Sequence, residues 1–438
     1  MSPQQRRVVI TGMGLISPVG NSKEALWDAL VNAKSGVGPL TVFPPDTVPV
    51  HVAAEAREFR GEIDDFGPLE KEQKKAIRKG LKMMSRECQM GVAAAQLALA
   101  DAGIAMGKVD PDRTGISFGV DYMLSVPEEF TEGVQQCLDD RGQFQFPRWG
   151  TEGLAKMQPL WLLKYLPNMP ASHLAIYNDL RGPNNSLTHR EAAANLAVGE
   201  AFQIIVRGNA DVMLCGATGT RVHSAKLVHA VQQEEVSCAN GDPARVSRPF
   251  DRDRTGMVLG EGAGTIVIEE LGRAQARGAT IYGEVIAAAS SSVAGPRLVA
   301  QRDRALVNVL RSLLDSSGTP AEEIGHLHAH GLSTRTCDAE EASAVQEVFG
   351  RRYQPLPVTA AKSYFGNLGA GSGMVELIAS LLALRHNRLF GILNYETPDP
   401  ECPIAAATGD SAVPGESFIN VNVTPQGQAA GVLVRRFA

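Results

Sequence analysis

Short apolar runs alternate with longer alanine-rich segments along almost the whole chain, and this alternation restricts the possible folds most. Arg7–Thr11, Asp211–Cys215 and Gly264–Ile268 have the continuous apolar character of buried strands. Glu191–Gly208 and Gly373–His386 have the length and small side chains of packed helices. Strands that alternate with helices predict a layered α/β fold. The 438 residues would suggest about three domains, but one α/β fold can reach that length.

Composition and charge argue against several classes of protein. The 48 acidic residues outnumber the 42 Lys and Arg residues, and the resulting net charge of −6 argues against a nucleic-acid partner. No apolar run approaches the roughly 18–20 residues of a membrane span, and the start MSPQQRRVVITGMG lacks the apolar core of a signal peptide. Six scattered cysteines without a CxxC pair predict neither a disulfide framework nor a zinc site. We therefore expect a cytoplasmic protein without a bound metal.

Four segments spread over the chain carry a family resemblance. They are RRVVITGMGLISPVGNS near the start, PFDRDRTGMVLGEGAGTIVIEEL at 249–271, HAHGLST at 328–334 and AAKSYFGNLGAGSGMVE at 360–376. The third resembles the motif NAHGTST, and the fourth resembles TKSxxGHxxGAAGxxE. Together these segments are similar to the β-ketoacyl-acyl-carrier-protein synthases, which are the ketosynthases of the thiolase superfamily.

The resemblance implies a fold, an assembly and a partner. We expect a thiolase-like, five-layered α/β/α/β/α fold of two similar halves, residues 1–265 with an irregular cap region at 121–170, and residues 266–438. The family forms two-fold dimers through the first half, works with acyl carrier protein and needs no cofactor. We expect the same partner here, either in a homodimer or in a heterodimer with an active ketosynthase.

The family's active site does not carry over intact. It needs a cysteine at a strand-to-helix elbow, which takes the acyl chain as a thioester, and two histidines, which assist decarboxylation of malonyl carrier protein. Counted from the RGP that precedes the elbow, the cysteine position holds Glu191. The first histidine is retained as His330, the second is replaced by Asn367, and the family's lysine is retained as Lys362. The family's acidic positions match Asp338, Glu341 and Glu376.

Two loops also depart from the family. Its glycine loop NSFGFGGTN, whose phenylalanine gates the acyl pocket, corresponds to NVTPQGQAA at 422–430, with Thr424 near the phenylalanine position and Pro425 beside it. Its GSGIGG loop corresponds to GVDYML at 119–124. The scaffold motifs are retained, whereas the parts that transfer the acyl chain are changed.

The chemistry of Glu191 argues against ordinary condensation. A carboxylate is a weak nucleophile toward a thioester, and its acyl product would be a short-lived mixed anhydride. Our leading hypothesis is a non-condensing partner of an active ketosynthase, similar to a chain-length factor. The alternatives are a decarboxylase or hydrolase of carrier-bound acyl groups that uses Glu191, His330 and Asn367, and a non-catalytic, acyl-binding homodimer. A purely structural interpretation of Glu191 is a helix N-terminal acid that backbone amides and Arg190 satisfy.

Two further patterns have a functional and a structural interpretation. The basic segment 71–86 is either a solvated helix face or a docking surface for acidic carrier protein, with Lys74, Lys75, Arg78, Lys79 and Lys82 as its contacts. The alternating histidines of HLHAH at 326–330 would share one face of a strand, as in some metal sites. The resemblance instead makes His330 the active-site histidine, so we do not expect a metal there.

Overall fold

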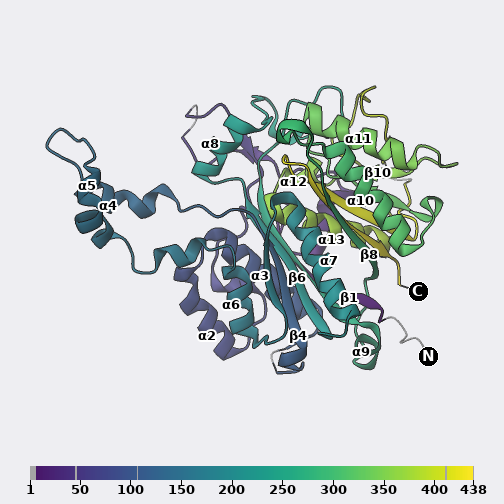
Figure 1. The fold of residues 1–438 in the computed structure, drawn as a ribbon, viewed down its shortest axis with the longest axis horizontal. Helices are drawn as coiled ribbons and strands as arrows, with labels where there is room; N and C mark the ends of the chain where they lie inside the picture. The colour runs from purple at the N-terminus through teal and green to yellow at the C-terminus, as the bar shows by residue number, and fades with distance from the viewer. Residues whose placement is uncertain (1–5, 45–46, 106, 410–411, 438) are drawn as a thin grey trace.

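The computed structural model describes residues 6–44, 47–105, 107–409 and 412–437, and its centre is one long mixed sheet (Figure 1). The strand order is β11-β10-β9-β12-β13-β8-β1-β7-β6-β4-β5, and β2 and β3 form a separate pair. The strands are β1 Val8–Ile16, β2 Gly38–Pro39, β3 Val52–Ala53, β4 Thr114–Val120, β5 Asn184–Thr188, β6 Val212–Thr220, β7 Glu261–Glu270, β8 Gly283–Ser292, β9 His326–His328, β10 Pro357–Thr359, β11 Ala405–Ala406, β12 Ser417–Val423 and β13 Gln428–Arg435.

The sheet consists of two halves that a short contact joins. β1 and β8 pair only between Val8–Ile10 and Gly283–Val285. On the first side, β4 and β5 run parallel and end the sheet. On the other side, β9 pairs in parallel with both β10 and β12. The predicted division between residues 265 and 266 falls within β7 and stays a prediction.

Helices form three layers around these two sheet halves. The α-helices are α1 Lys23–Val31, α2 Lys71–Gly80, α3 Arg86–Asp101, α4 Thr131–Gln136, α5 Phe146–Arg148, α6 Met169–Asn178, α7 Ala193–Val206, α8 Ser224–Gln233, α9 Leu271–Ala276, α10 Arg302–Ser317, α11 Arg335–Phe349, α12 Lys362–Phe365 and α13 Ser372–His386. α3 packs on β1, β6 and β7, and α10 packs on β8 and β13. α7 and α13 lie between the two sheet halves, with β6 on one side and β8 or β12 on the other (Figure 1).

The central position of α13 follows from its sequence. Residues 372–384 are all buried, so α13 has no polar face for solvent, as expected of a helix enclosed on every side. Its Leu377 and Leu381 share one apolar cluster with Val198 of α7, Ile266 of β7 and Val432 of β13. The arrangement helix, sheet, helix, sheet, helix agrees with the predicted five layers.

Two glycines of β1 allow α3 to pack directly against this strand. A Cβ atom on Gly14 of β1 would lie 2.3 Å from the carbonyl oxygen of Ala94, and one on Gly12 would lie 2.5 Å from that of Ala98. Both carbonyls belong to α3. The glycines of the opening TGMG segment therefore let α3 lie directly against β1.

A long arm projects from the first half, on the left in Figure 1. It comprises residues 127–165, which leave β4 and return to α6, and it includes α4 and α5. The rings of Phe130, Trp149 and Trp161 pack together in it, and the centroid of Phe130 lies 6.5 and 5.3 Å from those of the two tryptophans.

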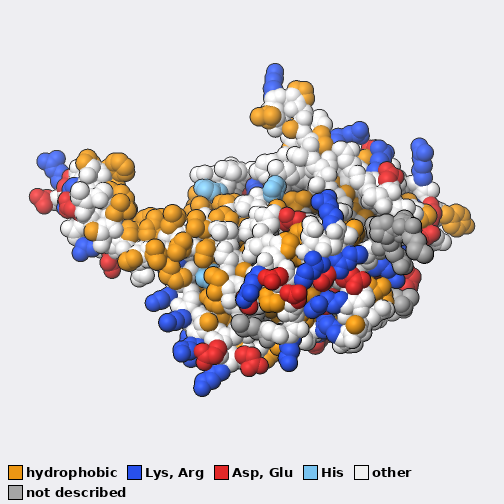
Figure 2. Space-filling model, turned by 60° about the horizontal axis from the view of Figure 1, so that its bottom comes forward, with side chains coloured by type: hydrophobic (Ala, Val, Ile, Leu, Met, Phe, Trp, Pro, Cys, Tyr) orange, Lys and Arg blue, Asp and Glu red, His pale blue; other side chains and the backbone are white. Residues whose placement is uncertain are grey.

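Large apolar side chains on the arm are nevertheless exposed, namely Val134, Leu138, Phe144, Phe146, Leu154, Leu160 and Leu162. Figure 2 shows apolar side chains that continue from the arm onto the body. The arm accounts for most of the predicted cap region.

Candidate active site

The chain turns from strand to helix at Glu191. After β5, the residues Arg190–Ala192 form one 3-10 turn that leads into α7. Arg190 has a φ of 47°, which a non-glycine residue rarely adopts. This tight elbow directs Glu191 into the molecule, where it is 1% exposed. The chain therefore has a strand-to-helix turn at residue 191, and its match to the family's cysteine position stays a prediction.

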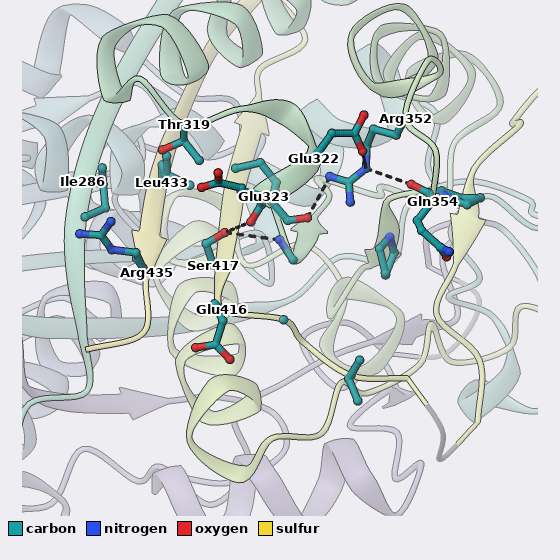
Figure 3. A pocket seen from close by; sticks show the side chains of 16 residues that line it. Ile286, Thr319, Glu322, Glu323, Arg352, Gln354, Glu416, Ser417, Leu433 and Arg435 are labelled. Carbon is teal, nitrogen blue, oxygen red and sulfur yellow. Dashed lines mark hydrogen bonds and ion pairs between the residues drawn. The ribbon is translucent and has the colours of Figure 1, made fainter. Parts of the chain in front are cut away.

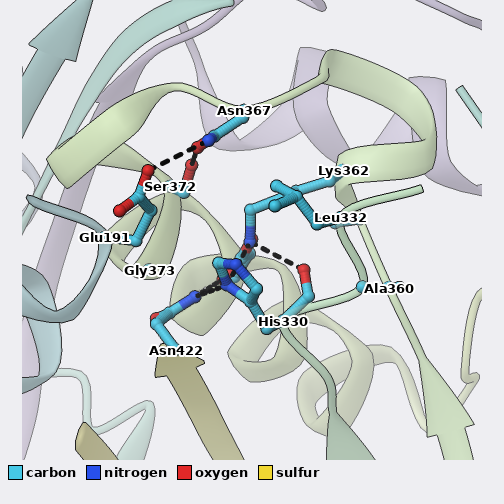
Figure 4. A network of polar contacts seen from close by, with 12 residues as sticks. Glu191, His330, Leu332, Ala360, Lys362, Asn367, Ser372, Gly373 and Asn422 are labelled. Carbon is cyan, nitrogen blue, oxygen red and sulfur yellow. Dashed lines mark hydrogen bonds and ion pairs between the residues drawn. The ribbon is translucent and has the colours of Figure 1, made fainter. Parts of the chain in front are cut away.

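Side chains, and not backbone amides, hold the Glu191 carboxylate. Asn367 Nδ2 donates to Oε1 at 3.1 Å (Figure 4). Arg221 Nη2 donates to the same oxygen, and Arg190 Nε lies 3.5 Å from Oε2. Burial would raise the pKa of this carboxyl, but the guanidinium charges of Arg221 and Arg190 outweigh it and hold the pKa well below its usual value. Glu191 is therefore an ionised, buried carboxylate.

The predicted ion pair with Arg190 belongs to a larger cluster. Arg221 is completely buried directly after β6, and its Nη1 donates to Glu234 at 2.8 Å. Arg190 Nη2 donates to the same Glu234 oxygen at 2.8 Å. Arg221 Nε lies 3.6 Å from Asp121 Oδ2. The sequence analysis did not find Arg221, Glu234 or Asp121 as site residues. Only Asp121 had a signal, because it lies in the altered loop 119–124.

His330 faces the same interior from the loop after β9. Lys362 Nζ lies 3.2 Å from its Nδ1 and Asn422 Nδ2 lies 3.3 Å away, and both groups are donors. Nδ1 must then be an acceptor, so the ring proton is on Nε2, which has no hydrogen-bond partner among the described residues. Burial and the nearby Lys362 charge lower the pKa of His330 well below its usual value. The site therefore holds a neutral imidazole with a free N–H donor.

Lys362 and Asn367 are fixed by their own partners. Lys362 Nζ donates to the His330 carbonyl oxygen at 2.8 Å and forms a buried ion pair with Glu376. Asn367 Oδ1 accepts from the Gly369 N–H at 3.0 Å and from the Ser372 hydroxyl at 3.2 Å. These bonds assign the amide orientation and turn Asn367 Nδ2 toward Glu191. The four predicted site residues thus form two hydrogen-bonded pairs, Glu191 with Asn367 and His330 with Lys362, which Figure 4 shows in one view.

Two further acids hold the loop that carries His330. Glu341 accepts from the N–H groups of His330 and Gly331, at 2.6 and 2.8 Å. Asp338 accepts from the N–H groups of Leu332 and Ser333. Burial raises the pKa of Glu341 to about 7 and that of Asp338 to about 6, although these N–H bonds oppose the shift. Both acids act on the loop backbone, because neither contacts the imidazole.

The other two histidines of HLHAH bind their own neighbours. His326 contacts the Pro414 carbonyl oxygen at 2.8 Å and the Ser380 hydroxyl at 3.1 Å. His328 contacts the same hydroxyl at 2.8 Å and accepts from the Ala361 N–H at 3.2 Å. All four ring nitrogens are thus engaged in hydrogen bonds.

A cavity of about 140 Å³ adjoins the charged cluster around Glu191. Its lining includes Glu234 of the charged cluster and Met257, whose sulfur lies 3.0 Å from Asn367 Nδ2. Arg302 and Pro425 also line it. Pro425 belongs to the altered loop, a tight turn between β12 and β13 in which the Thr424 N–H bonds the Gln428 carbonyl oxygen at 2.8 Å.

A larger cavity, of about 550 Å³, lies at the starts of β10 and β12 (Figure 3). Its Arg352 donates to the carbonyl oxygens of Ala321 and Ile324, and its Arg435 pairs with Glu284. These cations are bound to the protein itself, so the larger cavity offers no comparable chemistry.

The six cysteines occupy other positions than residue 191, and one of them, Cys337, lines the smaller cavity. Cys215 is buried within β6, where burial raises its pKa well above the usual value. Four others are also buried, and Cys238 is exposed. A raised pKa disfavours the reactive thiolate.

The predicted docking residues lie on and just after α2. Lys75, Arg78, Lys79 and Lys82 are exposed, whereas Lys74 pairs with Asp64 at 2.8 Å. Lys and Arg side chains gather at the lower left of Figure 2. Docking of carrier protein here stays a prediction. In the described ranges, no helix is long and apolar enough to cross a membrane.

A layered thiolase-type fold, with an elbow facing a histidine and a lysine from the second half, is the architecture of a ketosynthase. The chain belongs to the beta-ketoacyl synthase family: residues 5–274 match its N-terminal domain and residues 282–396 its C-terminal domain. The chain is 32% identical over 409 residues to a 3-oxoacyl-[acyl-carrier-protein] synthase 2 of Synechocystis, covering 93% of this chain and 92% of that protein. It is 31% identical over 404 residues to the synthase of the same name from Coxiella burnetii, covering 92% and 91%.

Solved structures agree with this assignment. A beta-ketoacyl synthase from Burkholderia phymatum superposes with a TM-score of 0.85 at 26% identity, over 99% of this chain and all of that one. The ishigamide ketosynthase/chain length factor superposes with a TM-score of 0.82 at 26% identity, with the same coverage. The predicted thiolase-like fold is confirmed.

Proposed function

We propose that this chain is a non-condensing, ketosynthase-fold subunit of fatty-acid or polyketide synthesis. It pairs with an active ketosynthase in the manner of a chain-length factor. The observation that carries the proposal is Glu191, which stands where the family's acyl-accepting cysteine would stand and which Arg221 and Arg190 keep ionised. Lowering the pKa of a carboxylate makes it less basic, and a less basic oxygen is a weaker nucleophile.

The exposed arm supports a partner subunit. Its apolar side chains, with Phe146 at 74% exposure, would be costly to leave in water. β5 pairs only with β4 and forms one end of the sheet. The chain leads into the arm from the end of β4, where Val120 pairs with Thr188 of β5. We therefore expect the arm and this edge of the sheet to contact the same second subunit.

Co-expression tests this proposal. The chain is co-expressed with a cysteine-bearing ketosynthase from the same genome, and the purified assembly is examined by light scattering. A one-to-one heterodimer whose product length changes with variants of this chain supports the proposal. A chain that remains homodimeric, and whose deletion leaves product length unchanged, argues for the acyl-binding homodimer instead.

One observation favours decarboxylation as a second candidate function. His330 retains a free Nε2–H, which is the kind of donor that stabilises an enolate oxygen. Glu191 opposes this use, because an ionised carboxylate repels both malonate and the enolate. Mass spectrometry of malonyl carrier protein incubated with the pure chain measures decarboxylation, with His330→Ala as the control. Turnover that depends on His330 would establish this candidate function in place of the non-catalytic one.

We also propose that the exposed basic residues of α2 contact acyl carrier protein. The double reversal Lys75→Glu and Lys79→Glu should weaken binding at least tenfold at low salt, because it replaces two attractive charges by repulsive ones. Fluorescence anisotropy with labelled carrier protein measures the loss. Lys108→Glu, an exposed lysine elsewhere, is the matched control. Unchanged affinity in the double variant would remove this docking site.

A further inference from the structure

Charged side chains surround residue 191. They restrict which groups could be attached at this position, whichever residue stands there. We propose that Arg221 excludes an acyl chain from position 191, so that the subunit is barred from acyl transfer by a second residue besides the missing cysteine. This inference rests on the proposed non-condensing function and adds a specificity-determining residue to it.

Arg221 is held rigidly. It follows β6, its N–H donates to the Gly260 carbonyl oxygen at 2.8 Å, and its side chain is 0% exposed. The guanidinium has a carboxylate on three sides, from Glu191, Glu234 and Asp121. Such a group cannot turn toward solvent without breaking several buried contacts.

Part of the cluster around Glu191 is held by charge without hydrogen bonds. Glu191 Oε2, Arg190 Nε, Arg221 Nε and Asp121 Oδ2 are buried and have no hydrogen-bond partner among the described residues. They face one another in pairs at 3.5 and 3.6 Å. The contacts found for the Glu191 carboxylate are polar or charged, from Arg221, Arg190 and Asn367. An alkyl chain attached at this position would therefore lie against ions and would strip them of their partners.

The same conclusion follows from the acyl-transfer step. Suppose that residue 191 were a cysteine. Its thiolate would attack the carbonyl carbon of an acyl thioester on carrier protein, a new C–S bond would form, and the carrier's C–S bond would break. The carrier's thiolate would leave and take up a proton. The product at residue 191 would be neutral, so Arg221 Nη2 would lose its anionic acceptor. Glu191→Cys alone should therefore not restore transfer of an acyl chain long enough to reach into the charged cluster.

Acyl loading of cysteine variants tests the role of Arg221. Glu191→Cys is compared with the triple variant that also carries Asp121→Ala and Arg221→Ala, which keeps the Arg190–Glu234 pair. Each is incubated with hexanoyl carrier protein and examined by intact-protein mass spectrometry. Iodoacetamide labelling shows that the thiol is reachable, and circular dichroism shows that each variant is folded. We expect at least tenfold more hexanoyl label on the triple variant.

A second measurement does not depend on the triple variant. On Glu191→Cys alone, acetyl carrier protein should load at least tenfold more than hexanoyl carrier protein, because a two-carbon group reaches less far into the charged cluster. Equal loading by both chains would overturn the inference, as would hexanoyl loading of Glu191→Cys equal to that of the triple variant. A reachable thiol that takes no hexanoyl group in either variant would also overturn it. Co-purification with an active ketosynthase tests the non-condensing function separately, on the unaltered chain.

Discussion

Glu191 and Arg221 behave as one unit because neither can be buried alone. A carboxylate and a guanidinium that are 1% and 0% exposed lose most of their hydration, and their ion pair restores a large part of that free energy. Lysine and carboxylate form a similar pair at Lys362 and Glu376. The candidate site is thus a place where single substitutions leave an uncompensated charge.

Glu191→Ala should therefore reduce the free energy of unfolding by about 3–5 kcal/mol, because it leaves Arg221 with an unpaired donor. The double variant Glu191→Leu with Arg221→Met should be much closer to the unaltered protein. Urea denaturation of the unaltered protein, of Glu191→Leu and Arg221→Met alone, and of the double variant gives the coupling energy. If the losses of unfolding free energy from the two single substitutions simply add in the double variant, Glu191 and Arg221 do not act as one unit.

Glu341 makes stability depend on pH. Its pKa is about 7 in the folded protein, above the usual value near 4.5, so the folded state binds a proton more tightly than the unfolded state. This contribution is complete below about pH 4.5 and is lost as the pH rises to about 7, a change of about 3 kcal/mol. Glu341→Gln should flatten that part of the stability profile, measured by denaturation at several pH values. Glu401→Gln, at an exposed position, is the control, and a steep profile in Glu341→Gln would contradict the assignment.

Elements with a strong apolar pattern were predictable from the sequence. The strand expected at Gly264–Ile268 lies within β7, and the helix expected at Gly373–His386 is α13, which begins one residue earlier. β12, at Ser417–Val423, was not predicted, because polar Asn420 and Asn422 interrupt its apolar pattern. Both asparagines are buried and bonded to side chains, Asn422 to Glu376 and Asn420 to Asn195.

The candidate site was predictable only where a motif carried it. Glu191, His330, Lys362 and Asn367 follow from aligned segments. Arg221 and Glu234 do not, because they come 30 and 43 residues after Glu191 in the chain. Only the folded structure brings Arg221 to Glu191 and Glu234 to Arg221. Contacts of this kind depend on tertiary structure, which no local pattern reports.

The contact between α3 and β1 gives a prediction at the scale of elements. Gly14→Ala should destabilise the protein by about 1–3 kcal/mol or more, because the new methyl group would overlap the Ala94 carbonyl oxygen and push α3 from the sheet. Thermal denaturation measures the effect. Gly241→Ala is the control, since an added Cβ there meets nothing within 4 Å. Equal stability of both variants would show that α3 moves freely.

For the whole molecule, we expect the arm to matter for the proposed assembly and not for folding. Its exposed side chains contribute little to the fold of the body, since Phe146 and Leu162 are 74% and 54% exposed. Replacing both by aspartate should leave the circular dichroism spectrum unchanged and shift the protein to a monomer in size-exclusion chromatography. Lys156→Asp, an exposed charge change on the same arm, should not dissociate the assembly. A double variant that still assembles would exclude the arm as the subunit contact.

The same arm has a consequence for the life of the protein in the cell. A newly made chain without the proposed partner subunit exposes the apolar side chains of the arm to chaperones, proteases and other unassembled chains. Its lifetime then depends on how soon a partner subunit covers these side chains. Production of this chain in excess of its partner should give aggregates or rapid turnover, so that the abundance of the two chains becomes matched without any dedicated regulator.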